Sequence, residues 1–448
     1  MRIRRRTRLV RCCGAVAAAV TLSVSAAAQE RVTLDEAIVR GLQHSARLAE
    51  LAAREAAAAA SADGRRAAGR PVVSLAGGYT RTNHVDEFTI AVPGQPPRVL
   101  YPDIPDNFRS RVDLQWPIYT AGRVDALERA ARAEATAARE DLAAARADLR
   151  LEITRAFWAL VIAGDTERVL ERSMANLDAH LADLRARLEQ GLIPPHEVLS
   201  AEAHRARQRV VSLEASNTRR IAEADLRRLI GGDGPLAPEG GLAPIFAPDE
   251  KTGPDPISRN ALQEAELGRS EKRALEARLA AARERVTAAD AQVKPQIAVA
   301  AGYDYARPNP RIFPRADRWD DSWDASVHVA WTLWDGGRRR AERAEATAAA
   351  RALEARITEF DRHAAFDVHA RALEVQASRA AIAAADDGIR SAEEALRVVR
   401  ERYRAGVATS TDVLDAETAV LHAHLDRTRA VAALRLGEAR LARARGTS

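Results

Sequence analysis

Cysteine is almost absent from this chain of 448 residues, which holds only two. Cys12 and Cys13 both fall within 1–28, where six arginines lead into an apolar run from Gly14 to Val24. A basic start, an apolar run and small residues before a cleavage point are typical of a secretory signal peptide. Cleavage after Ala28 would leave a mature chain without a thiol, so we expect neither a disulfide nor a cysteine-linked lipid anchor.

Long apolar runs are missing beyond the predicted signal peptide. A helix that crosses a membrane needs about 18 or more predominantly apolar residues, so a transmembrane helix is excluded. A net basic charge is missing as well: without the six arginines, 62 Lys and Arg stand against 63 Asp and Glu, and the formal charge falls from +5 to −1. Nucleic acid is therefore not an expected partner. If the chain spans a membrane, it does so by strands.

Aromatic residues are scarce at 4% of the chain, yet five of the six tryptophans lie in or beside segments with alternating apolar and polar residues. The clearest segment runs from Ser322 to Leu333, with apolar side chains on one face and aromatic residues near both ends. This pattern is typical of a membrane-spanning β-strand. Over four such segments we expect these aromatic residues at the membrane interfaces: Tyr79, Trp116, Tyr303, Trp323 and Trp331.

The chain contains an internal duplication. Trp116 and Trp331 lie 215 positions apart, and the same offset relates Gly191 to Gly406. At the first strand of each copy the offset becomes 224, so the first copy carries nine extra residues in a loop. Each copy reads as helix, strand, loop, strand, long helix, tight turn and helix.

The duplication and the turn signals predict the organisation of the chain. The expected parts are a signal peptide, 1–28; a first structural repeat, 29–231, with a helix, a β-hairpin at about 71–118, a long helix 122–190 and a helix 195–231; an equatorial linker, 232–256; and a second structural repeat, 257–448, with a helix, a β-hairpin at about 295–334, a long helix 337–405 and a helix 411–446.

Four strands are too few to close a barrel, because about eight is the practical minimum and open edges are not tolerated in lipid. The barrel must be shared between chains, and two, three or four chains would give 8, 12 or 16 strands. Each long helix would span roughly 100 Å, and two shorter helices end to end would match it. Because both hairpin loops lie on the far side of the strands, all helices should project to one side, the periplasmic side.

No catalytic motif is evident. His422 and His424 are two residues apart and face different sides of a helix, while His363 and His369 are six apart, so a zinc site is not expected. The sequence has neither a glycine-rich phosphate loop nor a nucleophile elbow. We expect no enzyme activity, no catalytic residue, no metal and no cofactor.

The segment from Tyr403 to Glu417, together with the repeat and the hairpins, resembles the TolC-like outer-membrane factor (outer membrane efflux protein) family. Its sequence, Tyr-Arg-Ala-Gly-Val-Ala-Thr-Ser-Thr-Asp-Val-Leu-Asp-Ala-Glu, is similar to the helix–turn–helix at the periplasmic tip of that family. The resemblance covers essentially the whole mature chain. It implies an α+β membrane protein whose four strands join a 12-stranded transmembrane β-barrel shared by a homotrimer, which continues into a long periplasmic α-helical coiled-coil barrel.

The resemblance also implies a function and partners. The family forms the outer-membrane exit duct of a tripartite efflux or type I secretion system in Gram-negative bacteria. Such a duct is a passive channel, opened at its periplasmic tip by a periplasmic adaptor (membrane fusion) protein and an inner-membrane transporter. Further copies of the chain, these two proteins and outer-membrane lipid are thus the expected partners. The cargo stays open, because drug, metal, peptide and protein export all fit.

Site residues are expected where this chain matches the family's motifs. Asp412 and Asp415 match acidic rings at the family's constriction, and their spacing of three also places both carboxylates on one helix face. The expected periplasmic gate contains Asp412, Asp415, Tyr403 and Glu197. The tip turns expected to contact the adaptor contain Gly191, Leu192, Gly406 and Val407, and the turns from barrel to helix contain Gly122, Gly336 and Gly337.

Two alternatives stay open. Asp412 could simply cap the returning helix, and the chain could be a periplasmic or surface coiled-coil structural protein with no conduit. The structural alternative explains the helices but not four alternating strands with aromatic ends. The sequence also departs from the family: in the first tip Glu197 replaces an aspartate and Ser200 lacks the second acid, and Ser45 begins a Ser-Ala pair where members usually carry Asn-Pro.

Overall fold

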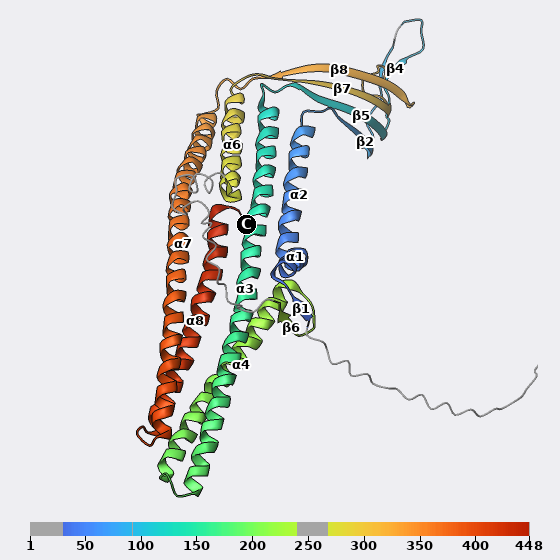
Figure 1. The fold of residues 1–448 in the computed structure, drawn as a ribbon. Coiled ribbons are helices and arrows are strands. Elements are labelled where there is room, and N and C mark those ends of the chain that lie inside the picture. Colours follow the sequence, from blue (N-terminus) through green and yellow to red (C-terminus); the bar gives the residue numbers. More distant parts are fainter. Residues whose placement is uncertain (1–29, 92, 240–267, 448) are drawn as a thin grey trace, which may run out of the picture.

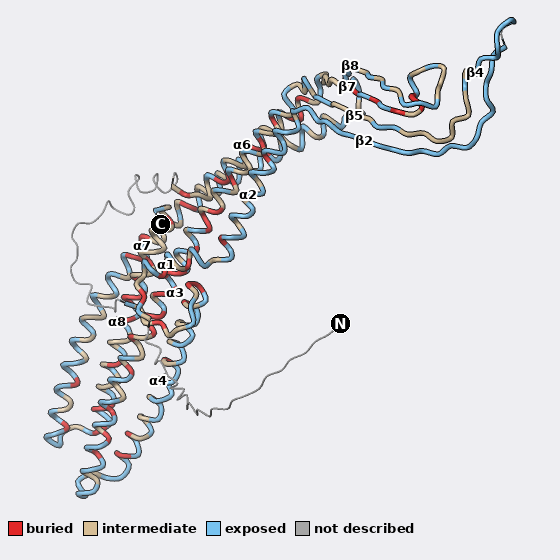
Figure 2. The backbone as a smooth tube through the Cα atoms, turned by 90° about the vertical axis from the view of Figure 1, so that its right-hand side faces the viewer, coloured by how far each residue is buried: buried red, intermediate tan, exposed pale blue. Residues whose placement is uncertain are grey.

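The computed structural model describes residues 30–91, 93–239 and 268–447. Long helices form a rod, and a four-stranded sheet leaves one end of this rod at an angle (Figure 1, Figure 2). The predicted signal peptide, most of the predicted linker and the start of the second repeat at 257–267 lie outside the described residues. No helix in the described ranges is both long enough and apolar enough to cross a membrane.

The two halves of the rod repeat one another. The long helices α3 (Arg123–Glu189) and α7 (Arg338–Arg404) have 67 residues each, and α4 (Pro195–Ile230) and α8 (Ser410–Arg445) have 36 each. The first and last residues of α7 and α8 each lie 215 positions after those of α3 and α4. The duplication predicted from the sequence is confirmed. At 1.5 Å per residue each long helix spans roughly 100 Å.

Each long helix is flanked by two shorter helices that follow one another along its length (Figure 1). α2 (Ala46–Ala67) and α4 pack against α3, α8 packs against α7, and α6 (Ser270–Ala291) packs against both α7 and α3. Many buried contact positions are alanine, which allows the helix axes to approach closely. Ion pairs such as Arg129–Glu284, at 2.9 Å, join neighbouring helices at their exposed flanks and contribute little each.

The first helix is interrupted at Ser45, although the sequence pattern predicts one helix over 33–69. α1 (Leu34–His44) ends there and α2 begins. Ser45 is extended, with φ −70° and ψ 109°, and its hydroxyl accepts a hydrogen bond from the Leu48 N–H at 3.3 Å. Serine favours this N-cap position. The break allows α1 to contact both α3 and α4.

A short parallel pair of strands ties the N-terminal end to the predicted linker. β1 (Glu30–Val32) pairs with β6 (Leu236–Pro238), an element that the sequence pattern does not predict. Both strands contribute to the largest apolar cluster among the described residues, in which Ile153 and Phe157 of α3 are 0% and 2% exposed. We call this group the equatorial cluster. Strands of three residues are too short to show a period of two.

The main sheet contains four antiparallel strands in the order β2-β5-β7-β8. The strands are β2 (Val72–Arg81), β5 (Asp106–Tyr119), β7 (Gln296–Arg307) and β8 (Asp320–Ala330). The prediction of four strands per chain is confirmed. Within the described residues, β2 and β8 each keep one edge without a partner strand.

The last strand is shorter than its alternating pattern suggests. The pattern continues to Leu333, but β8 ends at Ala330, which pairs with Gln296 at the start of β7. Residue 295 is proline and has no N–H to donate. The neighbouring strand therefore ends before residues 331–333 can pair.

A second departure is the small hairpin β3 (Phe88–Ile90) and β4 (Arg98–Tyr101), which lies inside the loop with the nine extra residues.

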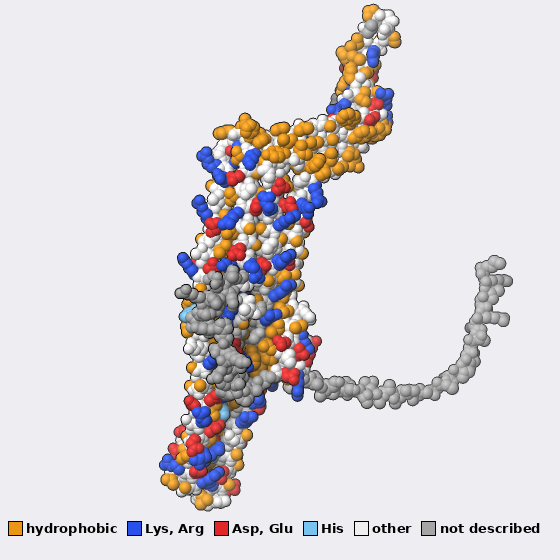
Figure 3. All heavy atoms as spheres, turned by 45° about the horizontal axis from the view of Figure 1, so that its top comes forward, with side chains coloured by type: hydrophobic (Ala, Val, Ile, Leu, Met, Phe, Trp, Pro, Cys, Tyr) orange, Lys and Arg blue, Asp and Glu red, His pale blue; other side chains and the backbone are white. Residues whose placement is uncertain are grey.

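The two faces of the sheet differ in chemistry. Hydrophobic side chains gather over the sheet, while charged side chains are spread along the helical rod (Figure 3). The register of the strands places large exposed apolar residues on one face: Val73, Leu75, Tyr79, Val112, Trp116, Tyr303, Trp323, Val327 and Val329. The opposite face carries charged and small residues. This division is typical of a strand with lipid on one side and water on the other.

Replacing Ile153 by alanine should destabilise the chain, because it removes a fully buried side chain from the equatorial cluster. The expected cost is about 2–5 kcal/mol. Ile221 is the matched control: it is 61% exposed on α4, and its replacement by alanine should change stability by less than about 0.5 kcal/mol. The measurement is the thermal midpoint of circular dichroism of the purified protein. Equal losses in the two variants would contradict this placement of the core.

Candidate functional site

Two helical hairpins form the end of the rod farthest from the sheet (Figure 1). Gly191 turns the chain between α3 and α4 with φ +72°, and Gly406 does so between α7 and α8 with φ +73°. A positive φ favours glycine because it has no Cβ. An exposed apolar residue follows each glycine, Leu192 at 68% and Val407 at 67%. The four predicted tip-turn residues therefore occupy equivalent places in the two repeats.

The two hairpins pack against each other through a second apolar cluster, which we call the tip cluster. Its buried members are Leu177, Leu181, Leu184, Val198, Ala201, Leu396, Tyr403, Val413 and Leu414. All four helices α3, α4, α7 and α8 contribute to it. Separating the hairpins would expose these side chains to water. This exposure costs about 25 cal/mol for each Å² of apolar surface.

Tyr403 lies within the tip cluster and is 9% exposed. Its ring meets the His180 ring edge-on with centroids 5.8 Å apart, and the Arg187 guanidinium lies 4.9 Å from its centroid. The Tyr403 hydroxyl is buried without a hydrogen-bond partner among the described residues. Burial raises the pKa of this hydroxyl; Arg187 works against the rise, and the charges of Glu197 and Asp183 add to it.

Glu197 lies in the first turn of α4 and is half-buried. Its Oε2 atom is buried and has no hydrogen-bond partner within the described part of the chain. Its charge raises the pKa of the Tyr403 hydroxyl, so the two groups lie near each other, although no hydrogen bond joins them. A buried polar atom without a partner costs about 1–3 kcal/mol. The structure thus brings two of the four predicted gate residues together.

Asp412 caps helix α8 through a capping box with Thr409. Its carboxylate accepts hydrogen bonds from the Thr409 N–H and hydroxyl, both at 2.8 Å, and its own N–H donates to the Thr409 oxygen at 3.2 Å. These hydrogen bonds, first the one from the backbone and then the one from the hydroxyl, lower the pKa of Asp412. The capping role that the sequence leaves open is therefore present. The side chain is nevertheless exposed to solvent.

Asp415 lies three residues further along α8 and is exposed on the same face. Among the described residues it has no hydrogen-bond or ion-pair partner. No such contact joins Asp412 or Asp415 to Tyr403 or Glu197 either. The four predicted gate residues consequently form two separate pairs, one inside the contact between the hairpins and one exposed at the start of α8.

Two histidines connect the repeats, and the sequence analysis does not identify them. His180 Nε2 of α3 lies 3.1 Å from the Ser410 hydroxyl of α8, and His204 Nε2 of α4 lies 3.1 Å from the Thr418 hydroxyl. The Thr418 hydroxyl donates to the Leu414 carbonyl at 2.8 Å, so its oxygen accepts from His204. The available signal was a histidine that interrupts the apolar stripe of α3 at helical spacing.

The turns between sheet and helix also use positive φ. Gly122 has φ +82°, Gly336 +69° and Gly337 +90°, so all three predicted positions need the conformational freedom of glycine. In the second turn the Asp335 carboxylate accepts from the Gly337 N–H at 3.2 Å and the Arg339 N–H at 3.1 Å. An ion pair between Asp335 and Arg339, at 2.7 Å, supports the same bend.

The predicted interface aromatics are all exposed in the single chain, by 44% to 73%. Trp116 and Trp331 lie toward the helical rod, whereas Tyr79, Tyr303 and Trp323 lie toward the outer half of the strands. Trp331 follows the end of β8, and its indole N–H donates to the Val293 carbonyl at 3.0 Å. Four of the five belong to the strand ladders, on the apolar face.

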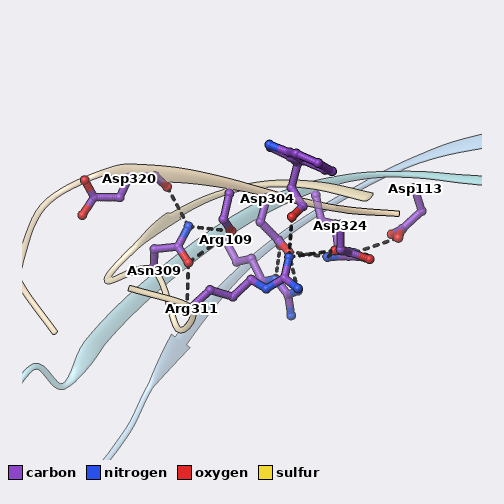
Figure 4. A network of polar contacts seen from close by, with 10 residues as sticks. Arg109, Asp113, Asp304, Asn309, Arg311, Asp320 and Asp324 are labelled. Atoms are coloured by element: carbon purple, nitrogen blue, oxygen red, sulfur yellow. Dashed lines mark hydrogen bonds and ion pairs between the residues drawn. The ribbon is translucent and has the colours of Figure 1, made fainter. Parts of the chain in front are cut away.

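The opposite face of the sheet carries a network of ion pairs (Figure 4). Asp304, which is 2% exposed, accepts two hydrogen bonds from Arg109, at 2.5 and 3.0 Å, and a further one from Arg111. Arg111 also pairs with Asp113 at 2.7 Å and with Asp324 at 3.2 Å. Three strands, β5, β7 and β8, are joined by this one guanidinium.

The sequence model of the family described as "Outer membrane efflux protein" matches residues 37–232 and 261–447. This chain belongs to the outer membrane efflux protein family. The resemblance to TolC-like outer-membrane factors, inferred from the tip motif and the duplication, is confirmed. The family match also falls into two segments, in keeping with the duplicated structure.

Relatives with known names share the sequence more weakly than the fold. Protein CyaE of Bordetella pertussis is 28% identical over 338 residues, which cover 72% of this chain and 69% of that protein. The outer membrane protein VceC of Vibrio cholerae superimposes with a TM-score of 0.75 at 22% identity, over 92% of this chain and 96% of that one. The CmeC channel of Campylobacter jejuni gives 0.78 at 15% identity, over 92% and 85%.

Membership in this family establishes the general role. This chain is an outer-membrane channel with a periplasmic helical extension and not an enzyme. The alternative of a coiled-coil structural protein without a conduit is thereby rejected. Proteins of this family form trimers and work with adaptors and inner-membrane pumps. In the ranges that the structure describes, no group of three or more His, Cys, Asp or Glu residues is placed to hold a metal ion.

The contact of His180 with the tip cluster predicts a loss of stability in acid. Burial lowers the pKa of His180; Glu417 and Asp183 oppose this shift, and Arg400 and Arg187 add to it. The folded chain therefore binds the proton less readily than the unfolded chain. The stabilisation of the folded chain by buried, neutral His180 is fully present above the unfolded pKa of about 6.5. It is lost as the pH falls below that value.

The test compares thermal midpoints at pH 7.5 and pH 5.0. The drop on acidification should be smaller in His180→Gln than in the unsubstituted protein, because glutamine does not titrate. His196→Gln, which changes an exposed histidine at the same tip, should retain the full drop. If His196→Gln and His180→Gln behave alike, burial of His180 is not the cause.

Proposed function

We propose that three copies of this chain form one 12-stranded outer-membrane barrel and one continuous periplasmic tunnel. The observation that carries the proposal is the four-stranded sheet with unpaired edges at β2 and β8, one apolar face and one charged face. Unpaired backbone groups in lipid cost several kcal/mol each, so both edges need partners. Pairing β8 of one copy with β2 of the next satisfies both edges, and three chains supply 12 strands.

The predicted division of the chain fits this assembly. The signal peptide, 1–28, would direct export, and each repeat would contribute one hairpin to the barrel and one pair of long and short helices to the tunnel. The exposed aromatic residues would then lie in two belts at the lipid interfaces, where their amphipathic rings are most stable. Outer-membrane lipid would cover the apolar face of the sheet.

The periplasmic tip forms the gate in this proposal. The tip cluster, which includes Tyr403 and has Glu197 nearby, holds the two hairpins together in the closed state. Asp412 and Asp415 are exposed at the start of α8, so three chains would place six carboxylates around a narrow opening. A ring of carboxylates attracts cations and repels anions.

Opening requires partners that separate the hairpins. The exposed apolar side chains of Leu192 and Val407, at the extreme end of the rod, offer a contact surface for a periplasmic adaptor protein. An inner-membrane transporter would complete a tripartite efflux or type I secretion system. The chain itself would act as a passive duct. Its similarity to Protein CyaE supports the general role and leaves the cargo unassigned.

Planar-bilayer conductance tests the duct and the acidic ring. The purified protein should show a small, cation-selective conductance, and Asp415→Asn should lower the cation-to-anion permeability ratio several-fold. Asp415 is the better probe than Asp412, because Asp412 also caps α8. Asp426→Asn is the matched control, since Asp426 lies on the same helix, exposed and away from the tip. Unchanged selectivity would show that these carboxylates are not part of the gate. A trimer that neither conducts ions nor restores export in a deletion strain would refute the duct.

Substitutions of Tyr403 separate packing from hydrogen bonding at the closed tip. Tyr403→Ala should raise the open probability several-fold, because it removes a buried ring from the tip cluster. Tyr403→Phe should remain closed, because the hydroxyl that it removes has no partner among the described residues. Single-channel recording measures both. A Phe variant as open as the Ala variant would show that the hydroxyl makes a closing bond in the trimer.

A further inference from the structure

A cavity of about 390 Å³ lies on the charged face of the sheet, toward the outer end of the strands. It is lined by residues of β2, β5 and β7 and of the loop between β7 and β8, among them Ala76, Gly78, Thr80, Arg109, Arg111 and Arg315. The small residues of β2 leave space beneath the arginine side chains. Because the loop and β2 share this cavity, the loop extends over the charged face of the sheet.

The loop is held there by hydrogen bonds (Figure 4). Asn309 is 2% exposed, and its amide donates to the Asp320 carbonyl and the Ser322 hydroxyl, both at 3.0 Å. Arg311 donates to the Trp323 carbonyl at 2.6 Å and to Asp324 at 3.3 Å. Both residues therefore bind to β8, which begins at Asp320. The position of the loop is therefore specified by contacts to the sheet.

The charged side chains that line the cavity are all arginines. Three of the described residues that line it are arginines, and none is Asp or Glu. Asp304 neutralises Arg109 and, with Asp113 and Asp324, Arg111. Arg315 has no ion-pair partner among the described residues. Arg315 is therefore the one lining charge without an ion-pair partner in the described part of the chain, and a positive charge in a concave wall attracts anions.

Arg315 is the lining residue best placed to bind an anion. Its terminal nitrogens donate to neutral partners, the Tyr101 hydroxyl at 2.7 Å and the Asn107 side-chain oxygen at 3.4 Å. Its Nε atom is buried and has no partner in the ranges that the structure describes. The side chain is half-buried, and its guanidinium lies 5.2 Å from the centroid of the Tyr101 ring, so its charge has an aromatic neighbour but no carboxylate. The planar fork of a guanidinium matches the oxygens of a carboxylate or phosphate.

We propose that this cavity is an anion-binding site at the outer end of the channel, which takes the carboxylate or phosphate group of a dissolved molecule. The inference rests on the proposed barrel, because the charged face lines the channel only if the strands close around it. It adds a site of opposite preference to the acidic tip. The occupant is a solute and not a lipid headgroup, because the cavity lies on the face opposite the apolar residues that would contact lipid. A trimer holds three such sites.

Isothermal titration of the purified full-length protein with inorganic phosphate, and separately with citrate, tests the site. Binding should occur at one site per chain and weaken with added salt. Arg315→Ala should weaken it at least tenfold. Thr80→Glu, which places a carboxylate in the cavity without altering the loop, should abolish it. The control is Arg318→Ala, a change in the same loop at a residue that pairs with Asp320 and does not line the cavity.

The outcomes separate this site from the proposed duct. Absence of phosphate and citrate binding, or equal binding by Arg315→Ala, Thr80→Glu and the unsubstituted protein, would overturn the site. If Arg315→Ala does not assemble, Thr80→Glu decides. A protein that conducts but binds neither anion would retain the duct and lose the site, whereas one that binds and never conducts would retain the site and lose the duct.

Discussion

The backbone hydrogen bonds at the edges of the sheet are the constraint on which the assembly depends. A four-stranded sheet leaves donors and acceptors unpaired along β2 and β8, and lipid offers them no partner. In the barrel that we propose, other copies of the chain supply those partners. The same requirement explains why the apolar residues fall on one face of every strand: once the sheet closes, one face meets lipid and the other meets water.

At the other end of the molecule, the gate that we propose depends on packing between two unequal repeats. The second hairpin begins α8 with a capping box, whereas the first begins α4 with Pro194 and Pro195 and no side-chain cap. Only the second hairpin therefore presents a fixed, exposed carboxylate at this point, Asp412. Duplication supplies the shared geometry of the tip, and the later divergence of a few residues gives its two halves different chemistry.

The sequence predicts the features that repeat, and it misses those that depend on contacts. Alternation in the strands, the 215-residue offset and the glycines at 122, 191, 337 and 406 were sufficient to place the hairpins, the long helices and their turns. The break at Ser45 has a local signal in its N-cap residue. The pairing of β1 with β6 has none, and for the contact between His180 and Ser410 the sequence offers only a histidine within the apolar stripe of α3, because the partners are 206 and 230 positions apart. The acidic pair was placed by its family motif, and its separation from Tyr403 and Glu197 becomes visible only in three dimensions.

The equal length of α3 and α7 limits how the rod can change in evolution. Each long helix is matched by two shorter ones laid along it, so adding residues to one helix alone would rotate every later side chain about the axis by about 100° per residue. A longer rod, suited to a wider periplasm, requires insertions of whole helical turns at the same height in a long helix and its short neighbour, and in both repeats. The loop between β2 and β5 bears no such restriction, and it is the loop in which the two copies differ by nine residues.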